Sequence, residues 1–233
     1  MDISISLIVG ISQAIIFNPI DKAIYTSIIT NTSIFNKSNW KKPFSGSTNN
    51  IYTRIITSGL YFYLIDYTKH LDTCQASLMI SLTTSLILNP FNVIKYRSYG
   101  NNISTYASLI STYNKYGMKF MKIGLASFIM RDFVFNLVYL NYKKSNNDLI
   151  YNCGVICTAS IISSPFHFIR NMKYNNDESV YSIMKTFTNN FKTTDNKARY
   201  IIRQFGIGHG TLRTIAGVYA GQVMYSSLKE IIR

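Results

Sequence analysis

The sequence predicts an all-α membrane protein, with six transmembrane helices in three tandem two-helix repeats and pseudo-threefold symmetry around a central cavity. Three observations predict this fold class: sparse charge, six long apolar segments, and a repeat marked by proline. Of the 233 residues, 47% are hydrophobic and 15% are charged, whereas a soluble domain carries about 25% charged residues. Too little charge remains to cover a water-facing surface. The mean hydropathy of only +0.08 indicates helices that keep polar faces.

Composition and motifs exclude several other classes of protein. Aromatic residues make up 14% of the chain, the reverse of a disordered composition. The cysteines and histidines lack the spacing of a metal site or a disulfide framework, and no nucleophile motif or phosphate loop occurs. We therefore expect no enzyme activity, no cofactor and no metal. The net charge of +14 is spread through apolar segments rather than gathered on one helix face, which disfavours a soluble nucleic-acid binder.

Six long apolar segments each approach the roughly 20 residues that a membrane-spanning helix needs. They contain Ser and Thr, whose hydroxyls can bond back to the helix backbone inside a bilayer. They also contain scattered charges, which at membrane depth normally face a water-filled cavity. Weaker amphipathic stretches near 104–116 and 179–192 predict short helices that lie on the membrane surface. The six segments are residues 3–30, 50–71, 75–98, 120–142, 149–172 and 199–231.

A proline repeats in the odd-numbered segments at a nearly constant interval. Pro19, Pro90 and Pro165 are 71 and 75 residues apart, and a small residue stands five positions before each of them. Proline removes a backbone donor and kinks a helix, so three such helices can converge below a cavity. Small residues let neighbouring helices approach closely there. A single domain, residues 1–233, therefore divides into repeats 1–73, 74–147 and 148–233.

The even-numbered segments repeat as well, with a glycine followed by a basic residue at mid-height of the helix. The interval is seven residues in two of the repeats, and the first repeat leaves a register doubt of one residue. The pairs are Gly124 with Arg131, Gly206 with Arg213, and Gly46 with Thr53, whose neighbour is Arg54.

The proline blocks resemble the mitochondrial carrier family, the solute exchangers of the inner mitochondrial membrane. That family is built from three two-helix repeats, each marked Pro-x-[Asp/Glu]-x-x-[Lys/Arg] at the end of its odd helix. Each block of this chain keeps only part of the motif. The acid and base positions are occupied by Asp21 and Ile24, by Asn92 and Lys95, and by His167 and Arg170.

The resemblance implies an inner gate in which each acid position faces the base position of the next repeat. Only one of the three implied pairs is a full ion pair, so we expect a weak gate that leaves the inner end prone to open. The implied partners are Asp21 with Lys95, Asn92 with Arg170, and His167 with Ile24.

A second, outer gate is implied by the family motif aromatic-acid-x-x-base at the end of the even helices. The motif survives in part, with an acid and a base in the first repeat and with the aromatic residue and the base, but no acid, in the third. The implied residues are Asp66, Lys69, Ser226 and Lys229.

The resemblance places the substrate site at mid-height of the even helices. Arginines that converge there bind phosphate or carboxylate groups bidentately. Adenine-nucleotide carriers favour a glycine–aliphatic pair on the fourth helix, whereas this chain has Arg131 and Asp132, closer to amino-acid carriers. A positive funnel is expected from Lys95, Arg97, Lys122 and Arg203. The implied substrate-binding residues are Arg54, Thr53, Arg131, Asp132 and Arg213.

The implied function is exchange of anionic metabolites by alternating access across the mitochondrial inner membrane, with nucleotides or deoxynucleotides the favoured substrates. An amino-acid or keto-acid carrier and a non-transporting membrane protein that retains the fold are the alternatives. Short carriers of this kind resemble those encoded by large DNA viruses, so the membrane would belong to a host cell. The expected partners are the substrate and membrane lipid, cardiolipin included, and we expect a monomer that binds no nucleic acid.

Overall fold

A computed structural model describes residues 3–143 and 149–232, and this part of the chain is helical, without a strand. Six long helices form its frame, and shorter helices connect them. The long helices are α1 (Ile3–Thr30), α2 (Ser47–Tyr67), α3 (Thr73–Asn101), α5 (Leu125–Tyr142), α6 (Leu149–Asn176) and α9 (His209–Ile232). The short ones are η1 (Lys37–Trp40), α4 (Thr105–Tyr116), η2 (Gly117–Lys122), α7 (Val180–Thr193) and α8 (Lys197–Gln204).

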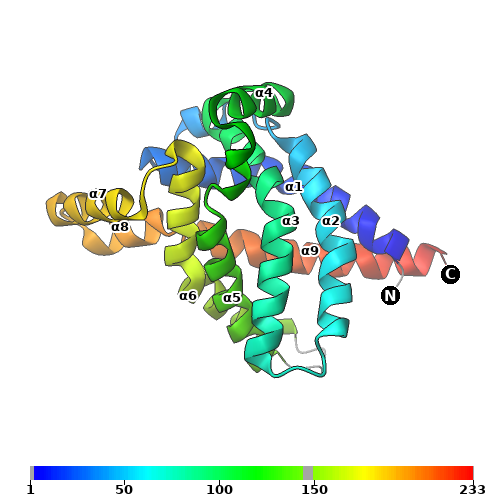
Figure 1. The fold of residues 1–233 in the computed structure, drawn as a ribbon. Coiled ribbons are helices and arrows are strands. Elements are labelled where there is room, and N and C mark those ends of the chain that lie inside the picture. Colours follow the sequence, from blue (N-terminus) through cyan, green and yellow to red (C-terminus); the bar gives the residue numbers. More distant parts are fainter. Residues whose placement is uncertain (1–2, 144–148, 233) are drawn as a thin grey trace.

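The long helices pack in a closed ring. Each contacts the next long helix along the chain, and α9 contacts α1. Figure 1 shows α2, α3, α5 and α6 side by side, while α1 and α9 run across them. The ring closes where the side-chain amide of Gln13 in α1 donates to the carbonyl of Gly217 in α9 at 2.7 Å. Residues from all six helices can therefore face one interior space.

Within the part of the chain that the structure describes, three helices are long and apolar enough to cross a membrane: residues 7–30 of α1, all of α3, and residues 150–176 of α6. These are the helices that contain Pro19, Pro90 and Pro165. A fourth span results if α5 and the preceding residues 105–122, bent by 45°, are counted as one. Over their described residues, α2 and α9 fall short of the same measure. The described residues thus contain three or four candidate spans, whereas the sequence segments predicted six.

Glycines interrupt two of the predicted segments. The segment 120–142 becomes η2 and α5, separated at Gly124 with φ 69°, and the segment 199–231 becomes α8 and α9. Between α8 and α9, Gly206 and Gly208 have φ 67° and 95°. Because glycine has no Cβ, it adopts these left-handed conformations without steric cost, and the helix ends there.

The short helices predicted near 104–116 and 179–192 are confirmed as α4 and α7. Each begins at a serine whose hydroxyl caps the first turn: Ser104 accepts from the amide of Ala107 at 3.2 Å, and Ser179 accepts from the amide of Ser182 at 3.1 Å. Such caps satisfy amides that have no partner within the helix. In the first repeat the shorter connection holds only η1.

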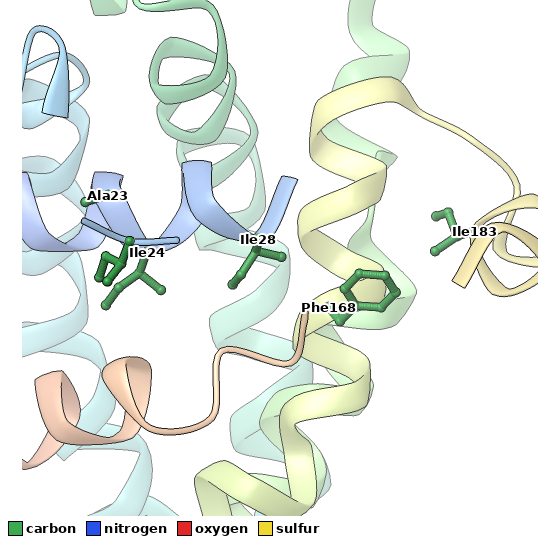
Figure 2. Close-up of a cluster of buried hydrophobic side chains, with 6 residues drawn as sticks. Ala23, Ile24, Ile28, Phe168 and Ile183 are labelled. Carbon is green, nitrogen blue, oxygen red and sulfur yellow. The ribbon is translucent and has the colours of Figure 1, made fainter. Parts of the chain in front are cut away.

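Buried apolar clusters join the three proline-bearing helices. Figure 2 shows one of them, where α1 faces α6 and α7. The other joins α3, the η2 region and α6. The first contains Ala23, Ile24, Ile28, Ile34, Phe168 and Ile183, and the second contains Val93, Ile94, Phe120, Ile123 and Tyr174.

A buried asparagine joins the second and third repeats directly before Pro90. The Asn89 side chain donates to the carbonyls of Met121 at 2.7 Å and Ile123 at 3.0 Å. Its oxygen accepts from the hydroxyl of Tyr174, on α6, at 2.6 Å. We call this arrangement the asparagine–tyrosine clasp, because one side chain holds both the turn before α5 and the neighbouring proline-bearing helix.

The same clasp joins the first and second repeats directly before Pro19. Asn18 donates to the carbonyls of Pro43 at 2.9 Å and Ser45 at 3.3 Å, and it accepts from the hydroxyl of Tyr99 at 2.7 Å. Both asparagines are fully buried. Sequence reasoning missed the clasp, although an Asn-Pro pair in two repeats and a tyrosine nine residues after Pro90 and Pro165 were visible signals.

A glycine with positive φ stands at each of three places where one of the repeats predicted from the sequence meets the next, and we call these places the seams. The φ angles are 72° at Gly46, 69° at Gly124 and 67° at Gly206. A Cβ added there would lie, respectively, 2.8 Å from the Tyr99 ring, 2.7 Å from the Tyr174 ring and 3.2 Å from the Ile28 side chain. These three neighbours each lie nine residues after a repeated proline, so the close approaches recur in cyclic order.

Candidate functional site

A cavity of about 450 Å³ lies inside the ring, and all six long helices contribute to its lining. Each helix places a charged side chain on the wall. Serine, threonine and asparagine side chains supply most of the remaining polar surface. The charged residues are Asp21 of α1, Arg54 of α2, Lys95 of α3, Arg131 and Asp132 of α5, Arg170 of α6 and Arg213 of α9.

The charges on the cavity wall do not balance. Among the described residues that line it, five are lysine or arginine and two are aspartate, a formal surplus of three positive charges. Like charges in a low-dielectric enclosure repel one another more strongly than in water. A bound anion would relieve that repulsion, so the electrostatics of the cavity select for negatively charged ligands.

Arg213 is engaged by a carboxylate inside the cavity. Its guanidinium forms a bidentate ion pair with Asp21, through Nε to Oδ1 and through Nη2 to Oδ2 at 2.7 Å. This corrects the implied pairing of Asp21 with Lys95. The reason is that α1 packs directly on α9, and the guanidinium fork matches both carboxylate oxygens, which a lysine ammonium cannot do.

Arg131 is engaged by its neighbour in the sequence. Its Nη1 lies 2.6 Å from Oδ1 of Asp132, and its guanidinium lies 5.2 Å from the centre of the Phe135 ring. The Arg131 side chain is 31% exposed, so the pair borders open space. In the first repeat both Thr53 and Arg54 line the cavity. The Thr53 hydroxyl donates to the carbonyl of Asn49 in its own helix at 2.7 Å.

The other implied pairs of the inner gate are also replaced. His167 does not take Ile24 as its partner, because Nδ1 accepts from Arg170 at 2.8 Å and Nε2 lies 2.9 Å from the amide of Asn171 in the same helix. Arg170 is therefore held by His167 rather than by Asn92, although Asn92 also lines the cavity. A spacing of three or four residues along a helix makes such local pairs easy to form.

Several predicted residues lie away from the cavity. Arg97 donates to the carbonyl of Tyr174 at 3.0 Å and packs over the Tyr116 ring, outside the cavity lining. Lys122 and Arg203 are also absent from that lining, so of the expected funnel only Lys95 reaches the cavity. At the expected outer gate, Lys69 is exposed beyond the end of α2. The side chains of Asp66, Ser226 and Lys229 lie outside the described residues.

Within the described ranges, no group of three histidine, cysteine, aspartate or glutamate side chains is placed to hold a metal ion. The described residues that line the cavity offer guanidinium, ammonium, carboxylate, imidazole, hydroxyl and amide groups. These groups bind anions and polar ligands through charge-assisted hydrogen bonds. Neither a protein-family model nor a curated protein matches this sequence.

Proposed function

We propose that this protein is a solute carrier that exchanges anionic metabolites across a membrane by alternating access, as members of the mitochondrial carrier family do. The observation that carries the proposal is the cavity, whose lining holds five basic side chains against two acidic ones. Its volume of about 450 Å³ lies within the usual range of small-molecule sites, about 300–1,000 Å³.

Two features support the finer architecture that we propose, six spans in three repeats around a pseudo-threefold axis. The proline-bearing helices are the ones apolar enough to span a bilayer on their own. The glycine contacts at the three seams recur in cyclic order. In this proposal α2, α5 and α9 cross the membrane with their polar faces turned inward, where a water-filled cavity solvates their charges.

Binding would begin with an exchange of partners. A substrate phosphate or carboxylate presents the same pair of oxygens to Arg213 as Asp21 does, so it can replace that carboxylate. It can replace Asp132 at Arg131 in the same way. At each arginine, the substrate replaces one charge-assisted contact with another, so the net binding free energy from one arginine is small. A substrate anion must therefore contact several basic side chains to bind well. A shift of these contacts between helices would then favour opening at one end of the cavity.

Nucleotides or deoxynucleotides are the substrates that we favour. A polyphosphate matches a surplus of three positive charges better than a monoanion does. Phe128 and Phe135 line the same cavity and offer ring faces for a base. The Arg131–Asp132 pair favours the amino-acid form of the second candidate, an amino-acid or keto-acid carrier, because adjacent charges of opposite sign suit a zwitterion.

The proposed setting is the inner membrane of a mitochondrion, in a host cell if the gene is viral, with the protein inserted as a multi-pass monomer. Its other partner would be anionic membrane lipid, cardiolipin included. Exposed apolar side chains on the proline-bearing helices, such as Ile16, Leu86 and Ile162, would face the acyl chains. Such exposure is unfavourable in water but ordinary in a bilayer.

The test is uptake into liposomes that contain the purified full chain and are preloaded with ATP, dATP, aspartate or 2-oxoglutarate. We expect labelled nucleotide uptake only where an anion is preloaded, and Arg213→Ala or Arg131→Ala should weaken apparent affinity about tenfold or more, because each removes a charge-assisted hydrogen bond. Exposed Arg199 provides the matched control: Arg199→Ala should leave uptake unchanged.

Uptake of aspartate or 2-oxoglutarate without nucleotide uptake would favour the second candidate. No uptake of any anion by well-inserted protein would refute transport and leave a membrane protein with another role. Wild-type affinity in both arginine variants would show that these side chains do not contact the substrate.

A further inference from the structure

Four tyrosines gather where the three proline-bearing helices meet, at the end of the cavity that holds Asp21, Lys95 and Arg170. We call this the proline end. Tyr96 lies at the centre: its ring centre is 4.6 Å from that of Tyr25, 5.4 Å from that of Tyr174 and 5.8 Å from that of Tyr99. Tyr25 belongs to α1, Tyr96 and Tyr99 to α3, and Tyr174 to α6. One aromatic cluster thus links all three helices.

Two buried cations lie against this cluster. The ammonium of Lys95 is 4.6 Å from the centre of the Tyr96 ring and 6.0 Å from that of Tyr99. The guanidinium of Arg170 is 5.0 Å from the centre of the Phe128 ring, 5.6 Å from that of Tyr96 and 5.8 Å from that of Tyr174. These distances fall within the range of about 6 Å over which a cation is attracted to a ring face. Tyr96 therefore lies within this range of both cations.

Among the described residues, neither Lys95 nor Arg170 forms a direct ion pair with a carboxylate. The carboxylate of Asp21 is bound by Arg213, and the ring of His167 bonds to Arg170 as a neutral acceptor. Lys95 and Arg170 are only 7% and 4% exposed, so both have lost most of their hydration. Burial of a charge is costly unless a partner offsets it, and the negative faces of the aromatic rings supply that compensation.

We propose that the proline end of the cavity is closed by a cation–π gate, in which Tyr96 holds Lys95 and Arg170 together in place of a ring of ion pairs. The gating role rests on the proposed transport function. Closure itself is a property of the fold and can be measured without transport. The gate joins side chains of three separate helices through non-covalent contacts, so it separates when those helices tilt apart.

The gate compensates for what the sequence lacks. Only one acid, Asp21, remains at the three acid positions after the prolines, and that acid is used elsewhere. Two of the three base positions, Lys95 and Arg170, keep their charge. Both cations lie near the ring of Tyr96. The weak closure expected from missing acids therefore does not apply, because ring faces rather than carboxylates receive the cations.

The experiment measures hydrogen–deuterium exchange of the full chain in detergent micelles, on peptides that cover residues 92–101 and 167–176. Tyr96→Phe keeps the ring face and should leave exchange near wild type. Tyr96→Leu keeps apolar volume without a ring face and should speed exchange in both peptides about tenfold, the loss expected for one desolvated cation–π contact. Tyr106→Leu, at a site that is 72% exposed, is the matched control and should change neither peptide.

A second series keeps the proposal testable if Tyr96→Leu does not fold. Phenylalanine analogues with one, two or three ring fluorines at position 96 retain size and shape while they weaken the negative ring face. For a cation–π gate, the logarithm of the exchange rate rises in proportion to the number of fluorines. A flat series, or equal rates in Tyr96→Phe and Tyr96→Leu, would overturn the gate, because closure would then depend on packing alone.

The two proposals fail in different ways. If the wild-type protein and all variants fail to transport any anion but the fluorine series is graded, the proposed function fails and the cation–π closure stands. If wild-type protein transports nucleotides but the series is flat, transport stands and the gate proposal is wrong. Faster exchange in the Tyr106→Leu control would also overturn it, since the effect would then not be local to the proline end.

Discussion

Two of the three seams between repeats are built alike, and the third is built differently. Where repeat one meets two and repeat two meets three, a buried asparagine, a tyrosine of the next repeat and a positive-φ glycine form the clasp. Where repeat three meets one, Ser164 and Ile28 stand at the corresponding positions, and Ile28 belongs to an apolar cluster with Phe168. The glycine is present at all three. The three seams therefore share a close contact between a glycine backbone and a side chain of the next repeat. That side chain is a tyrosine at two seams and an isoleucine at the third.

The largest expected effect comes from the glycines. Gly124→Ala and Gly46→Ala should each lower the free energy of unfolding by roughly 2–4 kcal/mol, because a Cβ meets both an unfavourable φ and a tyrosine ring. Gly206→Ala should lower it by only about 1–2 kcal/mol, since its nearest contact is the flexible end of Ile28. Denaturant unfolding of the three variants in detergent micelles measures the difference. Equal losses at all three would mean that φ strain alone sets the cost.

A smaller effect should separate the polar seams from the apolar one. Asn89→Ala or Asn18→Ala removes an acceptor for a buried tyrosine and a donor to two carbonyls, so we expect a loss of about 2–3 kcal/mol. Ser164→Ala should cost roughly 0.5 kcal/mol or less, because that hydroxyl donates within its own helix to Ile161. The same unfolding measurement checks both. A comparable loss for Ser164→Ala would contradict the distinction between the seams.

The smallest effect would come from rebuilding the clasp at the third seam. Made singly, Ser164→Asn should be neutral or mildly destabilising, whereas Ile28→Tyr should cost roughly 1–3 kcal/mol because it overpacks a buried position. Together they should recover about 1 kcal/mol of coupling, because the new hydroxyl and the new amide can bond to each other. A double-mutant cycle on unfolding free energy measures this coupling. Strict additivity would show that the third seam cannot hold the polar arrangement.

The sequence patterns predicted the long helices well, because hydrophobic runs and repeated prolines are local signals. The two surface helices, α4 and α7, were also predicted within a residue or two. The breaks at Gly124 and Gly206 were missed: these glycines marked the repeat, yet a positive φ is a backbone property that no spacing reveals. The number of membrane spans could not be predicted from the sequence either. Over their described residues, α2 and α9 are long enough to cross a membrane but are not apolar enough to count as candidate spans.

The partners inside the cavity could not be predicted from the pattern. Asp21 and Arg213 are 192 residues apart, and their contact depends on how α9 returns to α1. The aromatic cluster around Tyr96 could not be predicted either. The chain has 18 tyrosines, and the sequence does not show which of them lie together in space. Residue type could be read from the sequence, whereas the choice of partner needed the packing of helices.

The ring closure between α1 and α9 has a consequence for the synthesis of the chain. Asp21 lies in α1, which comes first in chain order among the six described long helices, whereas its partner Arg213 lies in α9, which comes last among them. Until α9 has been made, the carboxylate of Asp21 lacks the guanidinium that binds it in the folded chain, and burial of a charge without a partner is costly. A chain arrested before α9 would therefore leave the ring of helices open, with the acid of Asp21 at the gap and without its arginine.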